Sequence, residues 1–215
     1  MCKLINNHGP LDMRYLDKIK ATIDKALGQH PRTIAIRVDL RLPVLETDAE
    51  DHLSNDNPSC FFDTDSSVIS RFFSSLDAQI NADLKRREKD TKQTFDHTLR
   101  YVWVKEQSKE HRDHYHVLVL LNKDNYGALG RYNAMSGNLA NRIRQAWTSA
   151  LRVDFETFKH LVHFPENPVY RLNRNALTWE YSQVFDDLIF RISYLAKKET
   201  KHYGTGYRSF GCSRR

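Results

Sequence analysis

Alternating apolar and polar residues predict a strand between Thr33 and Leu42. Every second residue there is apolar, which is the period of a β-strand with one buried face. Two later stretches, residues 98–106 and 113–121, are rich in β-branched and aromatic residues, and the polar run between them is typical of a hairpin loop. The short apolar stretch over residues 160–164 is followed by a proline and predicts one more strand.

Apolar residues recur at helical spacing in four other parts of the chain. This spacing predicts amphipathic helices over residues 12–27, 66–87, 129–150 and 182–196. In the last of these, Tyr194 lies nearly opposite the centre of the apolar stripe, among charged residues. A phenol in such a position is either an ordinary surface tyrosine or one whose ionised form is favoured by nearby positive charge.

The length of 215 residues suits one sizeable core, and the chain shows no internal repeat. We therefore expect a single domain over residues 1–215. Three segments decorate it in this prediction: an N-terminal helical cover (1–31), an acidic loop insert (43–65) and a basic C-terminal segment (199–215).

Charge is unevenly distributed along the chain. The formal net charge is +6 and the pI is about 9.2, which favours a polyanionic partner. Residues 191–215 hold seven basic residues and one acidic residue, whereas residues 46–65 hold seven acidic residues and neither lysine nor arginine. The acidic insert is either a solvated loop or a regulatory arm that mimics DNA.

Two histidines on the predicted strand over residues 113–121 suggest a metal site. Side chains alternate along a strand, so His114 and His116 project from the same face. If the hairpin loop closes symmetrically, Glu106 lies directly opposite His114 on that face. Two imidazoles and a carboxylate suit Mg²⁺ or Mn²⁺, and the absence of a nearby cysteine argues against a closed zinc site. The alternative is a pair of ordinary histidines beside an unrelated charge.

A metal held in this way would leave coordination positions open and could polarise a phosphoryl oxygen. Tyr194 could then attack the phosphorus and form a phosphotyrosine while a 3′-hydroxyl is released, provided that a neighbouring lysine or the metal supports the charged oxygen. Such chemistry nicks DNA and can rejoin it.

The same residues resemble motifs of a known superfamily. His114-Tyr115-His116 resembles the His-hydrophobic-His motif of HUH endonucleases, and Tyr194 with Lys197 and Lys198 resembles their tyrosine-plus-lysine motif. More narrowly, the chain resembles replication proteins of the YagK/YfjJ family from prophages and inoviruses. This likeness rests on residues 114–118, 161–165 and 208–214.

The resemblance implies an α+β fold with a central antiparallel sheet of four to five strands flanked by helices. It also implies metal ligation by Glu106, His114 and His116, and a catalytic Tyr194 supported by Lys197 and Lys198. The implied activity is site- and strand-specific nicking that starts rolling-circle replication, with single-stranded DNA or an origin hairpin as the partner.

The basic C-terminal segment is a candidate DNA-binding element. Its aromatic and basic residues could clamp a single strand by stacking and phosphate contact, or the segment could be a frayed tail. The residues expected to contact DNA are Arg191, Lys201, Tyr207, Arg208, Phe210 and Arg214.

Other functions remain open at this point. The same chemistry could serve transposition or conjugation, the scaffold could be a regulator that binds DNA without cutting it, or the three ligands could hold iron in an oxygenase. The chain shows no Walker-type loop, so unwinding would require a host helicase or replisome. Three widely spaced cysteines and no bilayer-length apolar run lead us to expect a cytoplasmic protein.

Overall fold

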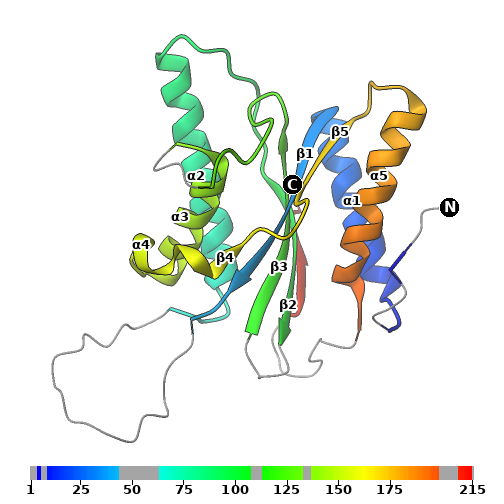
Figure 1. The fold of residues 1–215 in the computed structure, drawn as a ribbon, viewed down its shortest axis with the longest axis horizontal. Coiled ribbons are helices and arrows are strands. Elements are labelled where there is room, and N and C mark those ends of the chain that lie inside the picture. The colour runs from blue at the N-terminus through cyan, green and yellow to red at the C-terminus, as the bar shows by residue number, and fades with distance from the viewer. Residues whose placement is uncertain are drawn as a thin grey trace, which may run out of the picture.

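A central antiparallel sheet separates two groups of helices (Figure 1). The computed structural model describes residues 4–5, 9–43, 63–107, 113–132, 137–198 and 208–214. Within these residues the sheet has six strands in the order β4-β1-β3-β2-β6, and β5 also pairs with β1. The strands are β1 (Arg32–Arg41), β2 (Arg100–Gln107), β3 (Asp113–Asn122), β4 (Val162–His163), β5 (Val169–Asn173) and β6 (Phe210–Cys212).

Helices cover both faces of the sheet (Figure 1). One face lies against α1 (Met13–Gln29), α5 (Thr178–Ile192) and the 3₁₀ turn η2 (Ser193–Ala196). The other face lies against α2 (Val68–Lys89) and α3 (Leu139–Leu151), and a short α4 (Phe155–Phe158) and the 3₁₀ turn η1 (Lys159–Leu161) follow α3. The sheet therefore lies between two apolar cores.

The sequence of strand β3 is almost continuously apolar because both of its faces are buried. Tyr115, Val117 and Val119 face the core beneath α2 and α3, whereas Leu118 and Leu120 face the core beneath α1 and α5. A strand that is buried on both faces needs apolar residues at consecutive positions rather than at alternate ones.

The structure confirms the α+β class and the antiparallel sheet flanked by helices, and it extends the sheet to six strands. β5 was not predicted, and β6 lies within the predicted basic C-terminal segment, for which no strand was expected. The prediction of one buried face for β1 was wrong, because Ala35 on its other face is fully buried in the core with α1 and α5.

The predicted helix over residues 129–150 begins later than expected. α3 starts at Leu139, after Gly130 and Gly137, which have φ angles of 86° and 85° and cannot belong to a right-handed helix. Asn138 caps the helix by accepting a hydrogen bond from the Asn141 backbone N–H at 2.9 Å. Apolar residues at helical spacing therefore extend further towards the N-terminus than the helix itself does.

Two other boundaries differ from the predictions. Within residues 160–164 only Val162 and His163 form a strand, because the preceding residues make the 3₁₀ turn η1. α5 begins at Thr178 and ends at Ile192, so Tyr194 lies in η2 rather than on a regular helix. A 3₁₀ turn has three residues per turn, and the helical-wheel position predicted for Tyr194 does not apply there.

Parts of two predicted segments lie outside the described residues. In the acidic insert the structure describes residue 43 and residues 63–65, and in the basic C-terminal segment it describes residues 208–214. Among the helices that the structure describes, none combines the length and the apolar character needed to cross a bilayer.

Candidate metal centre

The pairing of β2 with β3 positions the predicted ligands. Glu106 is directly opposite His114 in the antiparallel register, as predicted from symmetric closure of the hairpin. Val102 and Val104 precede Glu106 on the same face of β2 and are buried beneath α1 and α5. Because strand side chains alternate, the register places all three candidate ligands on that face.

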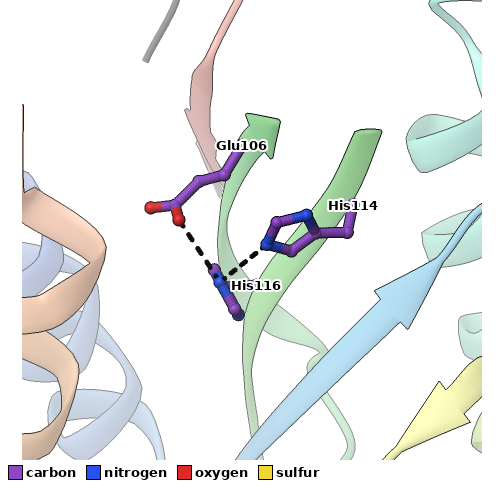
Figure 2. Close-up of side chains that lie close together, drawn as sticks. All are labelled: Glu106, His114 and His116. Carbon is purple, nitrogen blue, oxygen red and sulfur yellow. Dashed lines mark hydrogen bonds and ion pairs between the residues drawn. The ribbon is translucent and has the colours of Figure 1, made fainter. Parts of the chain in front are cut away.

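Figure 2 shows the three side chains converging from neighbouring ends of β2 and β3. The Nε2 atoms of His114 and His116 are 3.2 Å apart, and His116 Nε2 is 3.4 Å from Glu106 Oε2. One ligand atom from each residue lies within 4.8 Å of the other two. These residues form a possible metal-binding group, which we call the Glu-His-His cluster.

Burial of the cluster supports its fit to a cation. Glu106 is 2% exposed and His116 is 7% exposed. Glu106 Oε1 is buried without a hydrogen-bond partner in the described structure. A buried carboxylate oxygen without a partner is costly, and coordination of a hard divalent cation is one way to satisfy it.

Asp39 is a residue of the site that the sequence prediction missed. It lies opposite His116 in the pairing of β1 with β3, and its Oδ1 is 2.6 Å from His116 Nδ1. A carboxylate in this place fixes the imidazole orientation and leaves Nε2 facing the other ligands. The signal was an acidic residue at a polar position of an otherwise buried strand, but its partner depended on a register between distant segments.

Opposing effects set the ionisation of the cluster. Burial would raise the pKa of Glu106, but the hydrogen bonds and positive charges of His116 and Lys197 lower it to about 2. Burial would lower the pKa of His116, yet its hydrogen bonds to Asp39 and Glu106 raise the pKa overall. Glu106 therefore remains a carboxylate, which is the form that binds a cation.

Tyr194 and Lys197 extend the cluster towards η2. The Tyr194 ring packs edge-on against His116, with 5.3 Å between ring centroids. Lys197 Nζ donates a hydrogen bond to the Tyr194 hydroxyl and lies 3.0 Å from Glu106 Oε2. Lys197 is 5% exposed, whereas Lys198 is exposed, and its backbone N–H donates to the carbonyl of Pro10, which precedes α1. The structure thus brings five of the six predicted metal and catalytic residues together, and Lys198 is the exception.

The residues predicted to bind DNA lie in separate places. Arg191 lies on α5 and donates to the Glu166 carbonyl. Phe210 lies on the same face as the cluster and stacks on Tyr15 with centroids 4.3 Å apart. Arg208 and Arg214 line a groove of about 680 Å³ beside α2 on the opposite face, with Tyr101 and Trp103. The other two, Lys201 and Tyr207, lie outside the described residues.

Comparison with known proteins gives a family. The model of the YagK/YfjJ C-terminal domain matches residues 2–213. The chain belongs to the YagK/YfjJ family. Two family relatives from Escherichia coli K12, both named as uncharacterized proteins, align over nearly their whole length. YfjJ is 39% identical over 93% of this chain and 93% of its own, and YagK is 38% identical over 96% and 95%. No solved structure matches this YagK/YfjJ-family chain.

Proposed function

We propose that this YagK/YfjJ-family chain is a metal-dependent DNA nickase and strand transferase of the HUH type, with Tyr194 as the nucleophile. The observation that carries the proposal is the contact of one tyrosine with both halves of the site. The Tyr194 ring packs on the candidate ligand His116, and its hydroxyl is hydrogen-bonded to Lys197, which also contacts Glu106.

The Glu-His-His cluster has the donor set for a divalent cation such as Mg²⁺ or Mn²⁺, and a bound ion would polarise a phosphoryl oxygen. Lys197 is already placed to hold the phenol oxygen and to stabilise negative charge that develops on it. Asp39 holds His116 in one orientation. These residues fix the nucleophile beside the place where a phosphate would bind.

The covalent step is a balanced transesterification. The Tyr194 oxygen forms a bond to phosphorus while the bond from phosphorus to the 3′ oxygen breaks. The products are a 5′-phosphotyrosine and a free 3′-hydroxyl, and overall one proton passes from the phenol to that 3′ oxygen. The bond energy is retained, so the reverse reaction can join the strand to a new 3′-hydroxyl. In a phage or prophage element this chemistry would initiate rolling-circle replication.

The test uses the full chain with Mn²⁺ and a library of random-sequence single-stranded oligonucleotides. We expect a covalent protein–DNA adduct that survives denaturing gels and that EDTA prevents. Tyr194→Phe should abolish the adduct, whereas the matched control Tyr181→Phe on α5 should retain it. Sequencing the captured DNA would give the recognised site. An adduct that persists in Tyr194→Phe, or the absence of any adduct when Mn²⁺ binds, would contradict the proposal.

A second candidate is a DNA-binding regulator that does not cleave. One contact favours it, because Lys197 supplies Glu106 with the positive charge that a metal would otherwise supply. This function predicts salt-sensitive DNA binding that persists in EDTA and yields no covalent product.

A further inference from the structure

Arg37 is a nearly buried cation next to the proposed nucleophile. It lies on β1, opposite Leu118 of β3, on the sheet face that also carries Asp39 and His116. Its side chain is 12% exposed, so it is largely but not completely shielded from water. In the sequence, Arg37 is only one polar position of the alternating strand predicted between Thr33 and Leu42.

The guanidinium of Arg37 has few partners. Its Nε is buried without a hydrogen bond, and among the described residues its only ion pair is with Asp39 Oδ1 at 3.8 Å. That same oxygen is 2.6 Å from His116 Nδ1. A buried charge that is weakly paired is destabilising, and proteins retain such groups where a ligand completes the pairing.

The neighbours of Arg37 indicate which kind of ligand would complete its pairing. Arg37 Cζ lies 5.4 Å from the centroid of the Tyr194 ring, which also contacts His116. Arg37 and the Glu-His-His cluster therefore flank the same phenol. A second cation is close, because Lys197 Nζ donates a hydrogen bond to the Tyr194 hydroxyl. The region next to Tyr194 is thus suited to an anion.

We propose that Arg37 forms an oxyanion subsite for the DNA phosphate that Tyr194 attacks. A guanidinium presents a planar fork of N–H donors that matches two phosphate oxygens. The assignment of this phosphate as the scissile one rests on the proposed nicking function. Binding of a backbone phosphate by Arg37 does not rest on that function, so phosphate binding and nicking can be tested separately.

The first test measures binding without cleavage. Fluorescent oligothymidylate is titrated against the Tyr194→Phe chain at several salt concentrations, with and without Arg37→Met. Loss of one phosphate contact should reduce the slope of log K against log salt by about 0.7. Arg37→Lys should keep most of the slope. The matched control Arg32→Met, on the same strand but paired with Asp124, should leave the slope unchanged.

If Arg37 only supports the Tyr194 ring, the slope will be the same with and without Arg37→Met, and the subsite proposal fails. It also fails if the chain does not bind the oligonucleotide at all. Thermal unfolding of each variant identifies loss of folding, and Arg37→Gln, which removes the charge but keeps a polar side chain, supplies the comparison if Arg37→Met does not fold.

The second test identifies the phosphate. An uncharged methylphosphonate replaces the scissile phosphate in the oligonucleotide selected for adduct formation. The wild-type adduct rate should fall more than tenfold, and Arg37→Met should show little further loss on the uncharged substrate. If Arg37→Met slows adduct formation by the same factor on the charged and on the uncharged substrate, the assignment to the scissile phosphate is overturned. A slope change without any adduct would uphold the phosphate subsite and contradict the nicking function.

Discussion

Two buried ionic clusters among the described residues differ in how completely their polar atoms are paired. In the Asp83 cluster, between α2 and α3, the fully buried carboxylate binds Arg86 and Arg142 through Oδ1 and Arg87 and the Tyr126 hydroxyl through Oδ2. In the Glu-His-His cluster, Glu106 Oε1 has no partner in the described structure.

The difference separates a structural role from a functional one. A buried carboxylate whose two oxygens are both saturated holds elements together and has no capacity left for a ligand. A cluster with an unpaired oxygen and two imidazole nitrogens facing each other retains binding capacity. Arg86 and Arg87, at the basic end of α2, serve the first role because both pair with Asp83.

The largest expected effect is on stability. Asp83→Ala leaves three guanidiniums without their shared carboxylate and should lower the free energy of unfolding by about 3–5 kcal/mol in urea titrations. The control Asp77→Ala removes a half-exposed carboxylate from the same helix and should cost about 1 kcal/mol or less. If the two variants lose the same free energy of unfolding, the Asp83 cluster has no special structural role.

The next effect is stabilisation by metal. At a free Mn²⁺ concentration one hundred times the Kd, the wild type should gain about 2.7 kcal/mol of stability. His116→Ala should lose this gain, while the control His160→Ala, an exposed histidine on η1, should keep it. A gain that survives in His116→Ala would place the metal elsewhere.

Asp39 tests how the ligands are held. Asp39→Asn should weaken Mn²⁺ binding about tenfold to a hundredfold, as measured by calorimetry, because His116 loses the carboxylate that orients it. Asp124→Asn, which removes a carboxylate paired with Arg32 at the other end of β1, should bind Mn²⁺ normally. An unchanged affinity in Asp39→Asn would mean that packing alone orients the ring.

The smallest effect concerns the support of η2 by α1. Asp12 caps α1 by accepting from the Arg14 backbone N–H, and its own backbone N–H donates to the Ala196 carbonyl. Asp12→Ala should cost about 1 kcal/mol at neutral pH. The hydrogen bond from Arg14 lowers the pKa of Asp12 from 3.8 to about 2.

The sign of the pH dependence follows from that shift. The folded state holds the carboxylate more strongly, so the stabilisation is complete above pH 4 and disappears as the pH falls towards 2. The free energies of unfolding of the wild type and of Asp12→Ala should therefore become equal as the pH is lowered, as measured by urea titration at each pH. If the free energies of unfolding of the two proteins differ by the same amount at pH 7 and at pH 2, the Asp12 cap stabilises the helix without its charge.

Local patterns predicted the Glu-His-His cluster because the hairpin joins neighbouring segments. Glu106 and His114 are brought together by a short connection whose symmetry could be judged from the sequence, and the structure has that register. Asp39 and Arg37 could not be assigned, because their roles depend on the pairing of β1 with β3, about eighty residues away. β6 was missed since three residues with a glycine among them carry almost no strand periodicity.

The alignment of β2 with β3 has a consequence for how this chain can vary. The Glu-His-His cluster depends on which residues lie opposite each other in the two strands, so inserting or deleting a single residue within either strand would send Glu106 or the histidine pair to the α2 side of the sheet. Substitutions can tune the centre gradually, whereas changes of strand length would eliminate it in one step.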